Sequence, residues 1–213
     1  MDTRAIIYLA RGQQYIGEAV RSAESAKGQY PPHILFPPPL SDNWYLDCVR
    51  FLASLTLLPY EQFLLLDTDT YVCGDLSDFF KALDRFDIVG THAIGRETMV
   101  QRNDIPASFP ELHVGAMAFN HNPQVKSLFS LWLYLFEQND NDQGALRRAL
   151  WEQKSIRLGI LPAEFCFRYR WGGLINGQVR VLHGREHGTP YEEIARQVNS
   201  EKGIRVWHRR ELA

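Results

Sequence analysis

Two carboxylates placed two residues apart, Asp67 and Asp69, directly follow the apolar run Phe63-Leu64-Leu65-Leu66. Such a run, bounded by polar residues, is typical of a strand covered on both faces in a largely parallel sheet. Residues two apart on extended backbone point the same way, so both carboxylates can approach one divalent cation. Ligands bind at the carboxyl ends of such strands, which favours a cation that bridges a diphosphate. The alternative is that both carboxylates cap the turn before a helix near Asp75.

A histidine after a later predicted strand can complete this cation site. His183 follows a predicted strand at residues 179–182 and stands next to Gly184. A nitrogen ligand added to carboxylate oxygens suits Mn²⁺ as well as Mg²⁺. This expectation requires the two strands to lie parallel in one sheet, because their carboxyl ends then meet at the same edge. His187 could take the role instead, and a lone histidine is more often structural.

Other polar residues beside predicted strands and helices are candidates for ligand contacts. Guanidinium groups match phosphate oxygens, although any one surface arginine can simply be solvated. The candidate phosphate ligands are Arg11, Arg50 and Arg185. Polar residues at the borders of apolar elements would face the substrate, unless they only cap helices and turns. These residues are Glu111, His113, Asp142 and Gln143.

The segments that must position these residues alternate between strand and helix patterns, which is typical of an α/β fold. Strands are predicted at residues 5–10, 33–36, 63–66, 87–91, 113–120, 156–161, 165–167 and 179–182. Helices are predicted at residues 13–27, from a cap at Ser41 or Asp42 to Pro59, at 75–83, 122–138, from 142 onward and at 190–198. The glycine in the strand at 113–120 indicates that something approaches its backbone closely. Residues 93–110 are expected to form a long loop; such loops are usually functional or disordered, and this one is a candidate for acceptor binding.

Composition limits the class of protein. The chain has 213 residues, 45% of them hydrophobic, and we expect a single domain over residues 1–213. A formal net charge of -2 argues against a nucleic-acid partner. Three scattered cysteines are typical of reduced thiols, and no apolar run is long enough for a membrane span. The expected compartment is therefore the cytoplasm.

The order of these segments resembles the GT-A fold nucleotide-sugar glycosyltransferases, in particular the bacterial family 8-like nucleotide-diphospho-sugar transferases. The resemblance covers about residues 6–184. It is carried by Ala10-Arg11-Gly12 and by the segments FLLLDTDTYVCGDL, FPELHVGAMAFN, NDQGALRRAL and VLHG. It implies a Rossmann-like, mixed but mostly parallel sheet flanked by helices.

The resemblance also implies roles for individual residues. Asp67 and Asp69 would hold Mn²⁺ (or Mg²⁺) on the donor diphosphate, and His183 would complete the metal site. Donor-binding residues would be Tyr8, Ala10, Arg11, Arg50, Thr68 and Arg185, with Tyr8 and Ala10 at the nucleotide base. Asp142 and Gln143 would be catalytic, facing the donor sugar, and Glu111 and His113 would lie on the acceptor side. The family often has a lysine and a tryptophan after the metal histidine; here Gly184-Arg185-Glu186-His187-Gly188 follows, and Arg185 is the candidate replacement.

The implied activity is transfer of a sugar from a nucleotide-diphosphate donor, with UDP as the family-level expectation, to a glycan or other small acceptor with retention of configuration. The first rival is a haloacid dehalogenase-like phosphatase, because an apolar run followed by Asp-Thr-Asp also matches the nucleophile motif of that family, with Asp67 as nucleophile. That motif usually lies near the amino terminus and needs a later lysine and an acidic pair at another strand end. The later lysines all stand in helical or terminal contexts, and no later predicted strand ends in paired aspartates; these lysines are Lys81, Lys126, Lys154 and Lys202. The second rival is a catalytically inactive, transferase-like binding protein.

Overall fold

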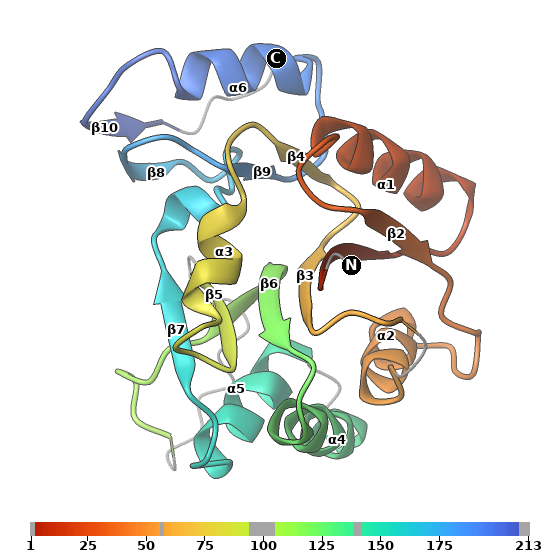
Figure 1. The fold of residues 1–213 in the computed structure, drawn as a ribbon. Helices are drawn as coiled ribbons and strands as arrows, with labels where there is room; N and C mark the ends of the chain where they lie inside the picture. Colours follow the sequence, from red (N-terminus) through yellow and green to blue (C-terminus); the bar gives the residue numbers. More distant parts are fainter. Residues whose placement is uncertain (1–2, 56–57, 94–104, 139–141, 209–213) are drawn as a thin grey trace.

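The computed structural model describes the chain except for residues 1–2, 56–57, 94–104, 139–141 and 209–213. Its centre is a six-stranded sheet in the order β2-β1-β3-β6-β5-β7 (Figure 1). These strands are β1 (Arg4–Leu9), β2 (Pro32–Leu35), β3 (Gln62–Leu66), β5 (Ile88–His92), β6 (Leu112–Asn120) and β7 (Leu158–Leu161). β6 is antiparallel to both of its neighbours, and the other pairs are parallel. The predicted α/β class with a mixed, mostly parallel sheet flanked by helices is confirmed.

Helices cover both faces of this sheet, because successive strand residues point to opposite sides. In β1, Ile7 packs into one core with α2, α4 and α5, while Ile6 packs into the other core with α1 and α3 (Figure 1). The helices are α1 (Gln13–Ser25), α2 (Trp44–Ala53), α3 (Ser77–Ala82), α4 (Pro123–Glu137) and α5 (Asp142–Glu152). The apolar runs of the central strands are therefore explained by burial on both faces.

Helix starts follow local capping chemistry. The side chain of Asn122 accepts a hydrogen bond from the Val125 backbone at 2.9 Å, which starts α4 at its predicted place. The predicted cap of α2 at Ser41 or Asp42 is wrong: Asn43 caps it by accepting from the Leu46 N–H at 3.2 Å. The Ser41 hydroxyl instead donates a hydrogen bond to Asp47 Oδ1 at 2.9 Å.

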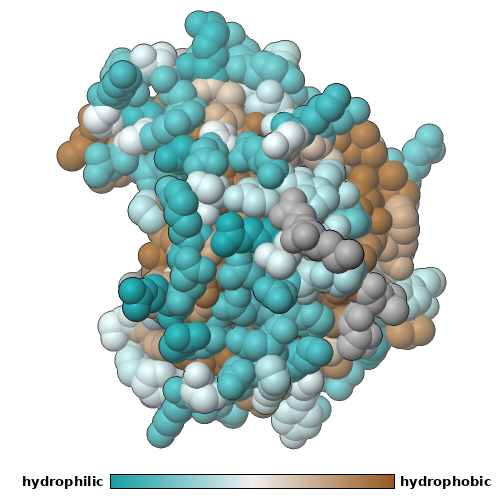
Figure 2. Space-filling model, viewed as in Figure 1, coloured by the Kyte–Doolittle hydropathy of each residue, from teal (hydrophilic) through white to brown (hydrophobic). Residues whose placement is uncertain are grey.

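The carboxyl-terminal part adds two small sheets above the carboxyl edge of the central sheet. β4 (Thr70–Val72) pairs with β9 (Val181–His183), and β8 (Gly173–Asn176) pairs with β10 (Ile204–Trp207), both antiparallel. α6 (Tyr191–Val198) packs on them through a third core that includes Phe167, Leu182 and Ile194. Figure 2 shows hydrophobic residues at the surface beside β8 and β10, where Leu174, Ile204 and Val206 are exposed.

Three short strands, β4, β8 and β10, were not indicated by the sequence patterns, because runs of three or four residues show no clear periodicity. The predicted strand at residues 165–167 is wrong. Residues Ala163–Phe165 form a turn of 3₁₀-helix, and Phe167 contributes only an isolated bridge to Leu182. Most of the predicted loop at residues 93–110 lies outside the described residues. Within the described residues, no helix is both long and apolar enough to cross a membrane.

Candidate functional site

Asp67 and Asp69 lie at the carboxyl edge of the central sheet, in the turn between β3 and β4. The Asp67 N–H donates to the Gly115 carbonyl at 3.0 Å, which places this turn against the start of β6. His183 reaches the same point because β9 pairs with β4, with His183 opposite Thr70. Its Nε2 lies 3.4 Å from Asp67 Oδ2 and 3.3 Å from Asp69 Oδ1. The structure therefore brings these three side chains together.

The route that brings His183 there differs from the predicted one. The expectation that β9 would run parallel to β3 in the same sheet is wrong, because β9 belongs to a separate two-stranded sheet. The turn through Asp69 instead leads β3 into β4, and antiparallel pairing with β4 delivers His183. His187 is exposed and, among the residues that the structure describes, belongs to no cluster of metal-ligating side chains.

Gly115 leaves the space in which the His183 ring lies. A β-carbon at residue 115 would lie 2.5 Å from His183 Cε1 and 2.7 Å from His113 Cε1. The rings of His113 and His183 meet edge to face, with centroids 4.7 Å apart. The predicted close approach to the backbone of this strand is confirmed, and the approaching groups are the two imidazoles.

The electrostatics of the cluster favour a cation. Burial alone would raise the pKa of Asp69, but hydrogen bonding to His183 and the charges of His183 and Arg185 lower it. Burial alone would lower the pKa of His183, but Cys166 and the two carboxylates raise it. A proton on His183 thus offsets the two carboxylates in the metal-free protein. Two oxygens and one nitrogen, all within 4.8 Å of one another, fit Mn²⁺ or Mg²⁺, which would displace that proton.

Arg185 and Thr68 are joined to this site by a residue that the sequence interpretation missed. The buried carboxylate of Glu18, on α1, accepts from Arg185 Nε at 2.8 Å and from Thr68 Oγ1 at 3.0 Å. The hydrogen bond that Arg185 donates to Glu18 raises the pKa of Arg185, and the charge of Arg185 in turn lowers the pKa of Asp69. The sequence offered one signal for this role: Glu18 is a carboxylate that adjoins Ala19 on the apolar side of a predicted helix. Arg185 keeps 47% of its side chain exposed and available to an anion.

Tyr8 and Ala10 lie at the end of β1, but both are completely buried. The Tyr8 hydroxyl accepts from Ser22 Oγ at 3.1 Å, and Ser22 contacts Thr70 Oγ1 at 2.7 Å. This contact ties α1 to the first residue of β4. The role of Tyr8 and Ala10 beside a nucleotide base stays a prediction. Their complete burial does not favour it.

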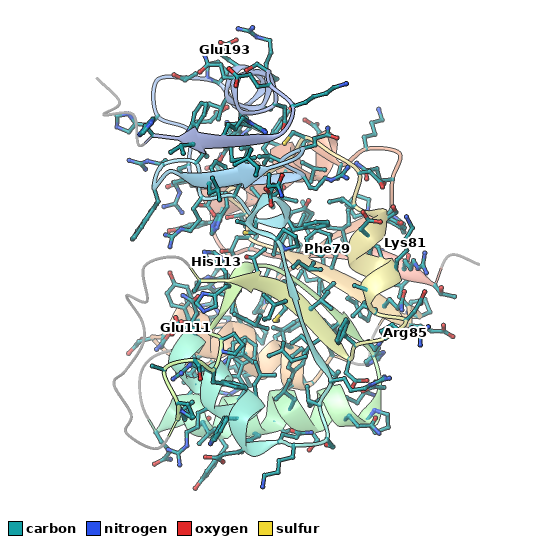
Figure 3. All side chains as sticks on the ribbon, turned by 90° about the vertical axis from the view of Figure 1, so that its left-hand side faces the viewer. Phe79, Lys81, Arg85, Glu111, His113 and Glu193 are labelled. Atoms are coloured by element: carbon teal, nitrogen blue, oxygen red, sulfur yellow. The ribbon has the colours of Figure 1, made fainter. Side chains whose placement is uncertain are left out.

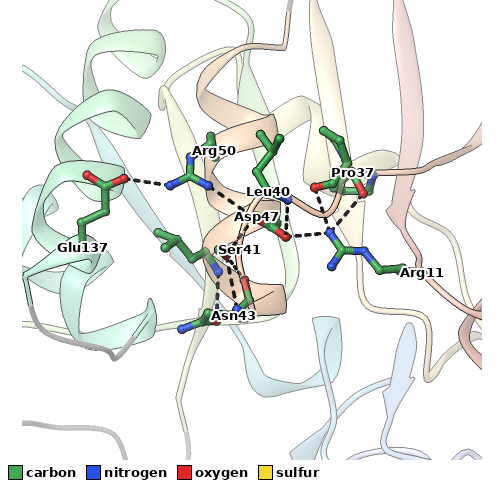
Figure 4. A network of polar contacts seen from close by, with 10 residues as sticks. Arg11, Pro37, Leu40, Ser41, Asn43, Asp47, Arg50 and Glu137 are labelled. Carbon is green, nitrogen blue, oxygen red and sulfur yellow. Dashed lines mark hydrogen bonds and ion pairs between the residues drawn. The ribbon is translucent and has the colours of Figure 1, made fainter.

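Arg11 and Arg50 are both held by the buried carboxylate of Asp47 (Figure 4). Arg11 Nη2 lies 2.7 Å from Asp47 Oδ2, and Arg50 Nη1 lies 3.3 Å from Asp47 Oδ1. Arg50 Nη2 also reaches Glu137 Oε1 at 3.0 Å. Burial would raise the pKa of Asp47, but hydrogen bonds from Arg11 and Ser41 lower it. The observed contacts of both arginines are structural, and phosphate binding by them stays a prediction.

Replacing Asp47 by asparagine is therefore expected to destabilise the protein by about 2 kcal/mol. This loss is smaller than the loss on breaking a fully buried ion pair, because the side chains of both arginines are about a third exposed. Because the pKa of Asp47 is lower in the folded protein, its carboxylate stabilises the fold at pH values above its unfolded-state pKa. That contribution to stability is lost as the pH falls through the folded-state pKa. Urea unfolding near neutral pH measures the difference. Asp78→Asn, which among the described residues breaks only the exposed pair with Lys81, is the control and should leave the free energy of unfolding nearly unchanged. Equal losses in both variants would contradict the role given to Asp47.

Asp142 and Gln143 form the first turn of α5, and Asp142 lies across a small pocket from Asp67. The pocket has a volume of about 90 Å³ and otherwise mostly apolar walls, among them Trp44 and Val114. Asp142 Oδ1 accepts from the Gln143 N–H at 2.7 Å. Gln143 Oε1 is buried and has no hydrogen-bond partner among the described residues. A carboxylate and an unsatisfied amide oxygen thus lie in adjoining positions near the acidic pair.

Burial and the charge of Asp67 raise the pKa of Asp142, although the Gln143 N–H opposes this. A raised carboxyl pKa means that ionisation costs stability, so this residue's contribution is lost as pH rises through its folded pKa. We expect Asp142→Asn to raise the free energy of unfolding of the metal-free protein by about 1 kcal/mol at neutral pH, since asparagine keeps the acceptor for Gln143. The gain should shrink on acidification. Melting temperatures at several pH values test this, and a loss of stability at neutral pH would refute it.

Glu111 and His113 are both buried, with exposures of 1% and 5%. Figure 3 shows His113 where β6 meets the carboxyl-terminal strands and Glu111 farther from them. Burial and the neighbouring His183 lower the pKa of His113 to about 3, so its imidazole is neutral. Their predicted acceptor contacts stay predictions.

Several solved structures of similar shape are glycosyltransferases. The glycosyltransferase GlyE of Streptococcus pneumoniae TIGR4 matches 96% of this chain with a TM-score of 0.59 and 14% identity. A glycosyltransferase involved in glycosylation of the major capsid of PBCV-1 matches 91% of this chain and 97% of its own, with a TM-score of 0.55 and 14% identity. The galactosyltransferase LgtC, solved with donor and acceptor sugar analogs, matches 88% of this chain and 89% of its own, with a TM-score of 0.62 and 13% identity.

These likenesses define the class of fold: the chain has the GT-A fold. It spans 58% of the length of GlyE. No protein-family model and no curated protein matches the sequence.

Proposed function

We propose that this protein is a metal-dependent glycosyltransferase that moves a sugar from a nucleotide-diphosphate donor, a UDP-sugar, to a glycan or other small acceptor. The observation that carries the proposal is the convergence of Asp67, Asp69 and His183 at the carboxyl edge of a GT-A sheet. Crevices at this edge are the usual ligand site of open α/β sheets. The glycosyltransferase structures of the same fold, one of them holding donor and acceptor sugar analogs, support the proposal.

Each part of the site has a role in this reaction. Asp67, Asp69 and His183 would hold Mn²⁺ or Mg²⁺, which neutralises charge on the departing diphosphate when bound. Arg185, oriented by Glu18, adds a guanidinium beside that diphosphate. Asp142 lines the pocket next to Asp67, and Asp142 and Gln143 would orient the donor sugar while an oxocarbenium-like state develops.

Binding of the donor is the direct test. Thermal-shift measurements with a panel of nucleotide sugars, with and without Mn²⁺, should show stabilisation that needs both ligands. An α-linked product from an α-linked donor, identified by NMR, would then support retention, and a β-linked product would refute it. If no donor shifts the melting temperature, the transferase proposal fails and a binding protein without donor chemistry remains.

The phosphatase alternative makes a different prediction. It requires Asp67 to act as a nucleophile, so phosphate release from p-nitrophenyl phosphate would be present and would disappear in Asp67→Asn. In the structure Asp67 instead shares the His183 imidazole with Asp69. We favour the transferase, in which both carboxylates serve one cation.

A further inference from the structure

A second cluster of buried side chains lies on the other side of His183 from the carboxylates. His113 from β6, Cys166 after the 3₁₀-helix and His183 from β9 come together with exposures of 5%, 2% and 8%. Cys166 Sγ lies 3.7 Å from His183 Nδ1 and 3.8 Å from His113 Nδ1. Figure 3 shows the His113 end of this cluster, where the central sheet meets the carboxyl-terminal strands.

These separations match those of a thiolate–imidazole metal site. Zinc binds sulfur at about 2.3 Å and nitrogen at about 2.0–2.1 Å, so a tetrahedral angle separates the two ligand atoms by about 3.5 Å. The ligand atoms all lie within 4.8 Å of one another. We propose that His113, Cys166 and His183 form a binding site for a soft, zinc-like divalent cation.

The chemistry of the donors separates this site from the carboxylate site. One sulfur and two imidazole nitrogens select zinc-like ions, whereas the two oxygens and one nitrogen of the first site accept Mn²⁺ or Mg²⁺. Binding forms one metal–sulfur and two metal–nitrogen bonds, and it releases the Cys166 proton and one proton of the His183 imidazolium to solvent. It also displaces the hydrogen bond that the Gly115 N–H donates to His113 Nδ1 at 3.0 Å. The free energy of one such hydrogen bond is smaller by about an order of magnitude than the free energy of zinc binding to a Cys/His site.

His183 belongs to both sites through opposite ring nitrogens. Its Nε2 faces Asp67 and Asp69, and its Nδ1 faces Cys166. A neutral imidazole has a single free lone pair, so His183 serves one cation at a time. A zinc-like ion in the buried site therefore removes the nitrogen ligand from the carboxylate site. Inhibition of transfer by such an ion follows, and this consequence alone rests on the proposed function.

Co²⁺ is a suitable probe, because cobalt bound to a thiolate gives a sulfur-to-metal charge-transfer absorption band. Titrating the metal-free, full-length protein with Co²⁺ should produce this band, saturating at one equivalent, and Zn²⁺ should abolish it. The band should vanish in Cys166→Ser and persist in Cys48→Ser and Cys73→Ser, which are the matched controls for the other two thiols. Absence of a band in the wild-type protein, or its survival in Cys166→Ser, would overturn the proposal.

A second variant keeps the test decisive if Cys166→Ser does not fold. His113→Gln retains the thiol, and its Co²⁺ affinity should fall at least about tenfold, with folding checked by circular dichroism; unchanged affinity would exclude His113 as a ligand and overturn the site. Mn²⁺ binding followed by electron paramagnetic resonance tests the shared histidine. Zn²⁺ should release Mn²⁺ from the wild-type protein at a concentration at least about tenfold lower than from Cys166→Ser, in which zinc competes only directly for the carboxylate site. If Mn²⁺ never binds, the proposed function fails while the cobalt band still reports on the buried site.

Discussion

Replacing Asp69 by alanine is expected to abolish metal-dependent donor binding while the fold survives. Asp69 is one of three side chains around the candidate cation, and its carboxylate is ionised because its pKa is lowered. Removing a residue that only hydrogen-bonds to a metal ligand commonly lowers metal affinity about 10- to 100-fold. Removing a direct ligand should therefore lower the affinity by at least about 100-fold. Calorimetric titration with Mn²⁺, and then with nucleoside diphosphate in the presence of Mn²⁺, measures both steps.

Asp78→Ala is the matched control for this variant, because Asp78 is a carboxylate whose side chain is 45% exposed and pairs only with Lys81 among the described residues. It should bind Mn²⁺ like the wild-type protein. Circular dichroism of Asp69→Ala should be unchanged, since the lost side chain leaves β3 and β4 intact. Undiminished Mn²⁺ affinity in Asp69→Ala would place the cation elsewhere and remove the main support for the transferase proposal.

Replacing Gly115 by alanine should disrupt both the fold and the site. The added β-carbon would lie 2.5 Å from His183 Cε1 and 2.7 Å from His183 Nδ1, which is closer than real contacts allow. The ring cannot move away easily, because β9 is paired with β4 and His183 is buried. Overpacking of this kind costs about 1–3 kcal/mol. If Gly115→Ala lowers the free energy of unfolding by about 2 kcal/mol, its melting temperature should fall by about 4–8 °C. Its Mn²⁺ binding should also be weaker.

Gly17→Ala provides the control, since Gly17 lies in α1 and a β-carbon there meets nothing within 4 Å. That variant should gain up to about 1 kcal/mol from helix propensity and keep its Mn²⁺ affinity. If Gly115→Ala melts and binds Mn²⁺ like the wild-type protein, His183 does not occupy the position described above. The close packing of the two imidazoles over β6 would then have to be abandoned.

The sequence by itself determined the features that depend on short stretches of chain. The apolar runs of β1 and β3, the helical periodicity of α1 and α4 and the acidic pair after β3 are local patterns, because burial imposes a period on neighbouring residues. The glycine at 115 also carried its signal locally, as a small residue inside a strand. These features were enough to predict the strands of the central sheet, its flanking helices and the position of Asp67 and Asp69 at a sheet edge, but not which other strands lie outside that sheet.

Only the tertiary structure decided which side chains meet. His183 reaches Asp69 through antiparallel pairing of two strands of three residues, β4 and β9, whose length leaves no periodic signal. Arg11 and Arg50 look in sequence like free phosphate ligands, but the fold brings the buried carboxylate of Asp47 to both. Cys166 joins the imidazoles through contacts between distant segments. Such partnerships depend on long-range register and chain crossing, which no local pattern encodes.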